Sequence, residues 1–449
     1  MGKLTQKYTK SVAVNMVIAN MIGTGIFTTL GYQVDEGIGI PDPFAIMIIW
    51  LIGGVVSLCG ATVYGEIATT VNKSGGEYAF LSSIYHPLVG FTSGWVSMIV
   101  GFSAAIAALA LAAGEYFLPL LGVTSEYSVA SIPVSKIVGA SMILLVVLVH
   151  IRGIKIGSIF QNYMTYVKLG LIAVFLVIPF LFMGDYEGSG ISIAPTEKSW
   201  DIIFSLPFAG ALVFVFFAYS GWNASSYIVG SLENPKKTLP FSLMVGTLIV
   251  TVLYLLLNYV FMYVATFDEL AFKPDLGNVV ANKILGPSVG LVFSAVFSLA
   301  LLSGLSAMFI AGPRVIQEIG KDYQIFKILG KQSAGGAPTY AIFVMMIISL
   351  TMVFALDFSQ LLEFTGLTLG IFSLMTVSGI FVLRFKKRAN ENTVRAWGYP
   401  FTPLVFMAIS LWMIYFFASM KPVVILWFFI MISPAIILYF ISKKIESKK

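Results

Sequence analysis

Three ionisable residues, Glu66, Lys168 and Glu363, lie within long apolar runs of the sequence. Charged groups are rare in such surroundings and mark functional positions by default. Lys168 lies too deep in its run for its four-carbon chain to carry the ammonium group fully out to water. We therefore predict that this ammonium group braces nearby backbone carbonyls, as a bound Na⁺ would, or that it binds and releases a proton.

The two acidic residues have different interpretations. Glu66 is near the predicted cytoplasmic end of its run, where helix capping or pairing with a loop cation explains it. Glu363 is near the outer end of its run, so a gate or pathway residue and a solvated helix start explain it equally well.

The composition indicates that lipid is the solvent for most of the chain. Of 449 residues, 58% are hydrophobic and 11% are charged, whereas soluble domains carry roughly 25% charged residues. The net charge of +6 is explained by cytoplasmic loops, where Lys and Arg gather, so it does not indicate nucleic-acid binding. A single cysteine, Cys59, and two histidines cannot form a disulfide framework or a metal cluster. We expect no metal and no cofactor.

Apolar runs long enough to cross a bilayer predict an all-α integral membrane protein. A helical span needs about 20 mostly apolar residues. Twelve runs fit: 11–35, 43–69, 87–113, 135–151, 158–183, 202–229, 240–265, 285–311, 339–355, 358–383, 400–419 and 423–442. With a cytoplasmic N-terminus, most Lys and Arg fall in cytoplasmic connections, as the positive-inside rule requires. We expect twelve transmembrane helices in the plasma membrane, with both termini cytoplasmic.

The first and sixth runs contain residues that interrupt a helix. The first has Ile22-Gly23-Thr24-Gly25-Ile26 near its middle, and the sixth has Phe217-Ala218-Tyr219-Ser220-Gly221-Trp222-Asn223. Close helix packing is the alternative explanation for the glycines of the first run. Interruptions at corresponding places in two halves indicate a transporter site. The sequence thus predicts broken helices 1 and 6 in two inverted five-helix repeats, plus two further helices, with divisions at 1–183, 184–383 and 384–449.

A broken helix offers both signs of partial charge. Free N–H groups at the start of its outer half suit a carboxylate, and free carbonyls at the end of its inner half suit an ammonium group. Together these groups would hold the zwitterionic part of an α-amino acid without any charged side chain.

Several motifs resemble the amino acid–polyamine–organocation superfamily, and within it the L-type amino acid transporter-like branch. They cover essentially the whole chain: Gly23-Thr24-Gly25-Ile26-Phe27, Tyr64-Gly65-Glu66-Ile67, Ser74-Gly75-Gly76-Glu77-Tyr78, Lys168, Phe217 to Asn223, Glu233-Asn234-Pro235, Leu383-Arg384 and Tyr399-Pro400. The resemblance implies the leucine-transporter fold and alternating access around a central substrate. Two residues depart from the pattern, because Asn72 replaces a common proline and Ser220 replaces a common glycine, which would narrow the pocket.

The resemblance also implies a binding site made mostly of backbone. The substrate carboxylate would meet the amides of Thr24, Gly25 and Ile26, and the amino group would meet the carbonyls of Met21, Phe217, Ala218 and Ser220. The full predicted substrate-binding set is Met21, Gly23, Thr24, Gly25, Ile26, Phe217, Ala218, Tyr219, Ser220 and Asn223. Phe217 would close over the substrate, and Glu363 is the other gate candidate. Lys168 stands where sodium-coupled relatives bind a cation, and Ser303 and Ser306 are candidates to complete such a site.

We expect a sodium-independent transporter of neutral L-amino acids, working as an exchanger or a proton-coupled symporter. Small polar positions such as Ser220, Asn223 and Ser303 favour substrates the size of alanine, serine or threonine. A cationic amino acid or polyamine carrier is the alternative, and it needs an acidic residue facing the pocket, for which Glu363 is the only candidate. An amino-acid sensor without transport is a third hypothesis, although sensors usually carry a large soluble extension.

Other function classes and partners are disfavoured. An enzyme is not expected, because no nucleophile–base pair, phosphate loop or metal cluster is recognisable. The expected partners are a small L-amino acid substrate and membrane lipid, and not nucleic acid. A monomer or weak homo-oligomer is expected, without a disulfide-linked partner, because Cys59 lies within a span.

Overall fold

The computed structural model describes residues 7–34, 39–124, 127–182, 192–271, 276–356, 358–391, 393–420 and 422–447. Their side chains are described except at 287–289, 292, 358–369, 417, 420 and 424. This part of the chain is helical apart from turns, connections and a small antiparallel hairpin of β1 (Ser128–Val129) and β2 (Ile132–Pro133), in which Ser128 pairs with Pro133.

The described residues between 7 and 203 contain eleven helical segments. They are α1 (Lys10–Met21), α2 (Gly25–Gln33), α3 (Pro43–Val71), α4 (Glu77–Ile84), α5 (Pro87–Val96), the π-helical η1 (Ser97–Ala104), α6 (Ala105–Phe117), η2 (Leu118–Leu121), α7 (Val134–His150) and α8 (Ile154–Phe182), with α9 (Glu197–Ile203) following the next connection.

The described residues after 203 contain ten further helical segments, from four residues in α12 to 47 in α13. They are α10 (Leu206–Tyr219), the 3₁₀-helical η3 (Ala224–Ser231), α11 (Pro235–Val264), α12 (Phe267–Leu270), α13 (Leu276–Asp322), η4 (Gln324–Gly330), α14 (Thr339–Ala355), α15 (Phe358–Phe385), α16 (Phe401–Met420) and α17 (Val423–Glu446).

Local sequence explains where the long helices begin and end. α3 starts after Asp42, whose Oδ1 accepts a hydrogen bond from the Ala45 N–H at 2.7 Å, and proline occupies its first position, where no backbone donor is needed. The helix ends at Val71, and the capping residue Asn72 has a left-handed φ of 50°. The φ angle of proline is locked near −65°, so the proline that is common here in the family could not adopt this backbone conformation.

Eight helices in the described residues are long and apolar enough to cross a membrane. They cover Lys10–Gln33, Pro43–Val71, Pro87–Leu121, Ile154–Leu181, Leu206–Ser231, Pro235–Val264, Phe293–Asp322 and Ile425–Glu446. Shorter apolar helices, Val134–His150, Thr339–Ala355, Gly370–Phe385 and Phe401–Phe416, coincide with the other predicted spans. The chain is thus a multi-pass membrane protein, while the count of twelve and the inverted repeat stay predictions.

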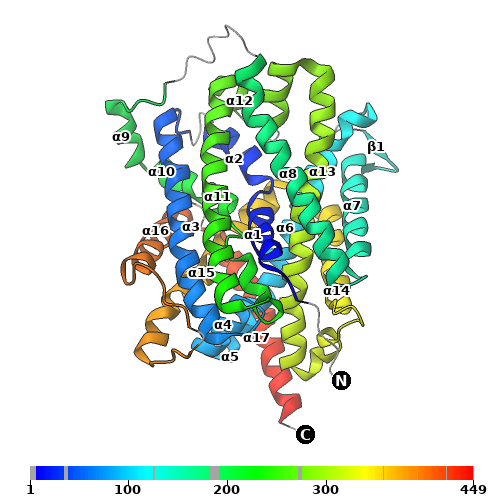
Figure 1. The fold of residues 1–449 in the computed structure, drawn as a ribbon, viewed down its shortest axis with the longest axis vertical. Coiled ribbons are helices and arrows are strands. Elements are labelled where there is room, and N and C mark those ends of the chain that lie inside the picture. The colour runs from blue at the N-terminus through cyan, green and yellow to red at the C-terminus, as the bar shows by residue number, and fades with distance from the viewer. Residues whose placement is uncertain are drawn as a thin grey trace.

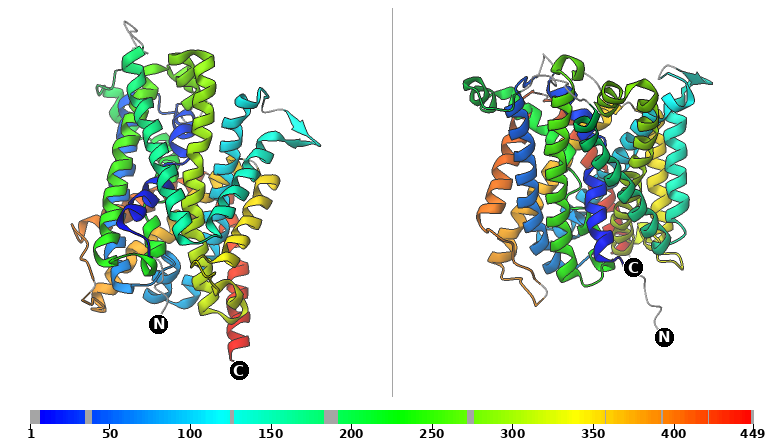
Figure 2. Two further views of the ribbon diagram at one scale, coloured as in Figure 1. Left: turned by 45° about the vertical axis from the view of Figure 1, so that its right-hand side comes forward. Right: turned by 45° about the horizontal axis from the view of Figure 1, so that its top comes forward.

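The broken first span occupies the centre of the bundle. Its apolar window is 89% buried, and that of Phe293–Asp322 in α13 is 83% buried, whereas that of α17 is only 17% buried. Figures 1 and 2 show α1 near the middle of the bundle, between α11 and α8, with α17 reaching the same end of the molecule at which α1 begins. The site predicted at the break therefore lies inside the protein and not on its lipid-facing surface.

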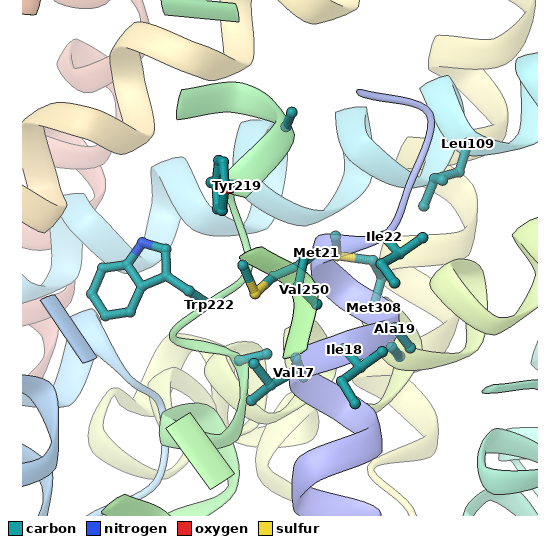
Figure 3. Close-up of a cluster of buried hydrophobic side chains, with 14 of the residues drawn as sticks. Val17, Ile18, Ala19, Met21, Ile22, Leu109, Tyr219, Trp222, Val250 and Met308 are labelled. Carbon is teal, nitrogen blue, oxygen red and sulfur yellow. The ribbon is translucent and has the colours of Figure 1, made fainter. Parts of the chain in front are cut away.

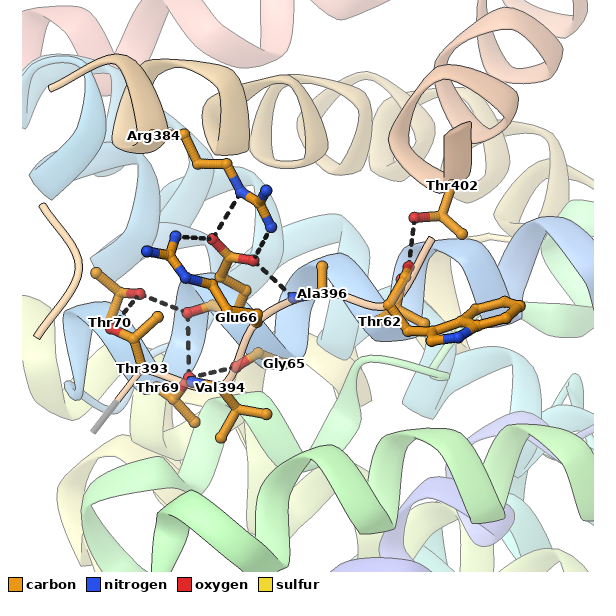
Figure 4. A network of polar contacts seen from close by, with 12 residues as sticks. Thr62, Gly65, Glu66, Thr69, Thr70, Arg384, Thr393, Val394, Ala396 and Thr402 are labelled. Carbon is orange, nitrogen blue, oxygen red and sulfur yellow. Dashed lines mark hydrogen bonds and ion pairs between the residues drawn. The ribbon is translucent and has the colours of Figure 1, made fainter. Parts of the chain in front are cut away.

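A polar network around Glu66 ties α3 to α15 and to the segment that follows α15. The Glu66 carboxylate accepts hydrogen bonds from Arg384 Nε at 3.0 Å and Nη2 at 2.6 Å, from Arg395 Nη1 at 3.3 Å, and from the Ala396 N–H at 2.6 Å (Figure 4). Glu66 is only 2% exposed. The structure thus confirms that Glu66 pairs with a loop cation, Arg395, and it adds Arg384 from the end of α15.

We expect Glu66→Ala to lower the free energy of unfolding by about 3 kcal/mol, because removing one partner of a buried ion pair leaves the other unpaired. Thermal unfolding of the purified protein in detergent measures this change. Glu197→Ala is the matched control, since Glu197 is exposed at the start of α9, and its effect should stay within about 0.5 kcal/mol. Equal effects of the two substitutions would contradict the structural role of Glu66.

Candidate functional site

The first span is interrupted where the sequence predicts it. α1 ends at Met21, Ile22 leaves the helical region with ψ at 83°, and α2 begins at Gly25. The Gly23 N–H turns back to the Met21 carbonyl at 2.8 Å. The first N–H groups of α2 have no acceptor within the helix, and the positive end of the α2 dipole points into the break.

The sixth span is interrupted as well. α10 ends at Tyr219, Ser220 is extended with ψ at 147°, and the 3₁₀-helical η3 begins at Ala224. Gly221 has a φ of 94°, and a Cβ on it would lie 2.8 Å from the Asn20 Cβ of α1. Only glycine fits this position without strain, and its backbone lies directly against α1.

The two breaks are packed against each other. A Cβ added to Gly25 would lie 2.7 Å from the Ala218 Cα and 2.8 Å from its Cβ. The Tyr254 hydroxyl of α11 lies 2.5 Å from the Met21 carbonyl oxygen and 2.9 Å from the Ala218 carbonyl oxygen. Tyr254 therefore links the end of α1 to the end of α10, and sequence reasoning missed it, because a lone tyrosine in an apolar helix gives no signal of its partners.

Apolar side chains enclose this junction. Figure 3 shows Ile18, Ala19, Met21 and Ile22 at the end of α1, with Tyr219 and Trp222 of the sixth span on one side and Leu109 of α6 on the other. Of the predicted site residues here, Met21 is 2% exposed and Tyr219 is 1% exposed. The Tyr219 hydroxyl donates to the Trp50 carbonyl of α3 at 2.9 Å, so that side chain fixes α10 against α3.

Lys168 of α8 reaches the break in the first span. Its ammonium nitrogen lies 2.5 Å from the Ile22 carbonyl oxygen and 3.4 Å from the Ala19 carbonyl oxygen, and the residue is 2% exposed. The last carbonyls of a helix lack intrahelical donors, and an ammonium group supplies up to three. The Lys168 side-chain nitrogen thus lies against carbonyl oxygens at the point where α1 ends.

The two serines proposed to complete a cation site are engaged elsewhere. The Ser303 hydroxyl donates to the Ala300 carbonyl at 2.9 Å, and the Ser306 hydroxyl lies 2.9 Å from His150 Nε2. Both serines are buried in α13. Within the described residues, no hydrogen bond joins either hydroxyl to Lys168. Sequence reasoning also missed His150 as the partner of Ser306, because the two residues lie far apart in the chain.

A cavity lies beside the break in the sixth span. Of the predicted site residues, Phe217, Ser220 and Asn223 line it, together with Asn20 of α1 and residues of η1, α15 and α16. The other members of the predicted set, Met21, Gly23, Thr24, Gly25, Ile26, Ala218 and Tyr219, are at the junction of the two breaks and not among the residues that line this cavity.

Glu77 also lines the cavity, and the sequence did not predict this position for it. It starts α4, in the connection between the spans of α3 and α5, and is 1% exposed. Its Oε1 accepts hydrogen bonds from the Tyr64 hydroxyl at 2.6 Å, the Ser373 hydroxyl at 2.8 Å and Asn223 Nδ2 at 3.3 Å. Burial raises the pKa of the Glu77 carboxyl group, although these hydrogen bonds oppose the change.

The prediction that Glu363 is the only acidic candidate facing the pocket is therefore wrong. Glu77 belongs to the Ser74-Gly75-Gly76-Glu77-Tyr78 motif, but a position in a loop between spans gave no sign that it reaches the cavity. The Glu363 side chain lies outside the described residues. Two hydrogen bonds hold the motif against η3: the Gly230 N–H donates to Ser74 Oγ at 2.8 Å, and the Gly75 N–H to the Tyr227 carbonyl at 3.0 Å.

The sequence matches one known family over most of its length. The family model described as "Amino acid permease" matches residues 11–442, which include both breaks, Lys168 and Glu77. The chain belongs to the amino acid permease family. The resemblance inferred from the motifs is thereby confirmed, and its glycine-containing breaks lie within the matched region.

Individual relatives cover most of the chain at low identity. The b(0,+)-type amino acid transporter 1 of Mus musculus is 28% identical, covering 89% of this chain and 80% of the relative. The serine/threonine exchanger SteT of Bacillus subtilis is 28% identical, covering 90% of this chain and 89% of the relative. The cystine/glutamate transporter of Homo sapiens is 26% identical, covering 86% of this chain and 75% of the relative. These relatives are transporters, and the prediction that the chain is not an enzyme is confirmed.

Proposed function

We propose that this chain is a sodium-independent carrier of neutral L-amino acids that works by alternating access. The observation that carries the proposal is the position of the Lys168 ammonium group, 2.5 Å from the Ile22 carbonyl at the break in the first span. An ammonium group on these carbonyls does the electrostatic work that a bound metal cation would do. Transport therefore needs no sodium to complete the site.

The paired breaks supply the groups for a zwitterion. The substrate carboxylate binds the N–H groups of Thr24, Gly25 and Ile26 at the positive end of α2. Its ammonium group binds carbonyls at the ends of α1 and α10, which are those of Met21, Phe217, Ala218 and Ser220. Each carbonyl has two lone pairs, so the Tyr254 hydroxyl does not exclude the substrate. Gly23 and Tyr219 complete the backbone of the site, and Phe217 closes over the bound substrate.

Alternating access exposes this site first to one side of the membrane and then to the other, and the proposed architecture makes this movement possible. Residues 1–183 and 184–383 form two inverted repeats of five spans, and 384–449 adds two further spans. Both termini face the cytoplasm, and the carrier works in the plasma membrane. Support comes from the positive-inside distribution of Lys and Arg and from the two interrupted spans at corresponding positions.

Small neutral substrates fit the cavity better than large ones. Ser220, Asn223 and Ser373 line it beside Phe217 and Trp222, which suits side chains the size of alanine or serine. One relative is named a serine/threonine exchanger, in keeping with this size. A cationic amino acid carrier is the second candidate, and Glu77 at the cavity favours it. Unlabelled lysine added during uptake of labelled serine separates the two candidates. Lysine should inhibit serine uptake only if the chain carries cationic amino acids.

Uptake of radiolabelled L-serine and L-alanine into proteoliposomes tests the proposal. We expect vesicles preloaded with the same unlabelled amino acid to take up more label than protein-free vesicles, and uptake to be unchanged when choline replaces sodium. An exchanger takes up label only into preloaded vesicles, whereas a symporter also fills empty ones. Uptake that requires sodium would overturn the role given to Lys168, and no uptake of any amino acid would overturn the transport proposal.

A further inference from the structure

Among the residues that the structure describes, only Oε1 of the Glu77 carboxyl group accepts hydrogen bonds. Three donors, the hydroxyls of Tyr64 and Ser373 and the amide of Asn223, all reach Oε1. Oε2 is buried and has no hydrogen-bond partner within the described part of the chain. A buried anionic oxygen without a donor is costly, because water no longer solvates it and no other group replaces water.

Within the described residues, no positively charged side chain is paired with Glu77. The titratable groups that face it are the phenols of Tyr64 on α3 and Tyr227 on η3, while α15 contributes the neutral Ser373. Arg384 and Arg395 are paired with Glu66, and the nearby Lys73 is paired with Asp322 at 2.7 Å. Among the described residues, no Lys, Arg or His contacts the carboxyl group, so a proton on Oε2 is the simplest way to neutralise it.

We propose that Glu77 is a proton-binding site that couples amino acid movement to proton movement. In the arrangement seen here Oε2 carries the proton and the carboxyl group is neutral. When the cavity opens and water reaches Glu77, the Oε2–H bond breaks and the proton passes to a water molecule. The three donors to Oε1 then stabilise the carboxylate that remains, so both forms are accessible during one transport cycle.

This inference rests on the proposed transport function and assigns the coupling proton to a residue other than Lys168. The Lys168 ammonium group has a structural task, since it holds the Ile22 and Ala19 carbonyls. Glu77 contacts Asn223 at the start of η3 and Ser373 on α15. Loss of its proton therefore changes the charge between the broken sixth span and α15.

A pH-gradient assay with Glu77→Gln tests the inference. The glutamine keeps an oxygen for the three donors and places an uncharged amide where the protonated oxygen lies, but it cannot release a proton. Acid outside the vesicles protonates Glu77 and drives uptake. We expect empty wild-type proteoliposomes to accumulate L-serine or L-alanine up to about tenfold for a gradient of one pH unit, and the ratio of uptake with and without the gradient to fall to about one in Glu77→Gln.

Exchange in preloaded vesicles without a gradient distinguishes failure of this inference from failure of the proposed function. Wild-type exchange with no response to the gradient would overturn proton coupling and leave the transport proposal intact. A Glu77→Gln variant that responds to the gradient as the wild type does would overturn the role of Glu77.

The Ser373→Ala variant removes one hydrogen-bond donor from the Glu77 carboxylate. The pH profile of uptake should then move to higher pH, and an unmoved profile counts against Glu77 as the titrating group.

Infrared difference spectroscopy gives a readout that does not need transport. We expect the carbonyl stretch of a protonated carboxyl group in the wild type at neutral pH, and its loss in Glu77→Gln. The matched control is Glu66→Gln, because the Glu66 carboxylate is ion-paired with Arg384 and should contribute no such band. If this band is missing from the wild type, or persists in Glu77→Gln, Glu77 is not protonated and the inference fails.

Discussion

Lys168→Ala is expected to reduce amino acid uptake by about 100-fold. The substitution removes the ammonium group from the Ile22 and Ala19 carbonyls. Hydrogen bonds to charged groups contribute about 1.5–3 kcal/mol each, and about 1.4 kcal/mol corresponds to a factor of ten. A loss of about 3 kcal/mol at the break therefore removes most of the binding-competent geometry of α1. Initial rates of label uptake into proteoliposomes measure the effect.

The matched control is Lys155→Ala in the same helix. Lys155 lies in the first turn of α8 and is exposed, so its loss removes one positive charge without touching the break. Its uptake should stay within about twofold of the wild type, because exposed substitutions usually change little. If Lys168→Ala transported as well as Lys155→Ala, the cation on the carbonyls would play no part in the mechanism.

Gly25→Ala is expected to abolish detectable transport while the protein still folds. The new Cβ would lie 2.7 Å from the Ala218 Cα, a separation at which backbone and not a flexible side chain must move. Overpacking of this kind costs about 1–3 kcal/mol, and here the strain separates the two breaks that form the proposed site. Exchange activity measures the loss, and size-exclusion chromatography of the purified variant checks that it is folded.

Gly170→Ala provides the comparison for this second substitution. Gly170 lies within α8, and a Cβ there meets nothing within 4 Å among the described residues. Alanine also favours a helix over glycine by about 1 kcal/mol, so this variant should be at least as stable as the wild type and fully active. Equal activity of Gly25→Ala and Gly170→Ala would show that the close contact of the two breaks is not needed.

The sequence predicted the features that depend on local chemistry. Glycines inside apolar runs weaken a helix wherever they occur, so the interruptions at Gly23–Gly25 and Ser220–Gly221 could be located from residue types alone. A lysine deep in an apolar run must find acceptors, and backbone carbonyls at a broken helix are the nearest unsatisfied ones. Lys168 needs hydrogen-bond acceptors, and the Ile22 carbonyl at the end of the broken helix needs a donor. Each group supplies what the other lacks.

The contacts that the sequence did not predict join side chains from helices far apart in the chain. Helical periodicity tells which face of a helix is buried, but it does not tell which neighbour that face meets. Tyr254 meets the Met21 and Ala218 carbonyls, and His150 meets Ser306, only because α11 and α7 pack in particular orientations. Glu77 was missed because α4 lies between two spans and still enters the protein interior.

Ligand-dependent thermal stability tests the central claim most directly, namely that an amino acid binds at the two breaks without sodium. The purified protein would be unfolded with each proteinogenic L-amino acid in turn, once in sodium chloride and once in choline chloride. Binding raises the melting temperature, by the equivalent of about 2.7 kcal/mol at a ligand concentration 100 times the Kd. We expect one or more small neutral amino acids to raise it equally in both salts, and Gly25→Ala to lose the effect. Stabilisation that appears only in sodium, or by no amino acid at all, would contradict this account.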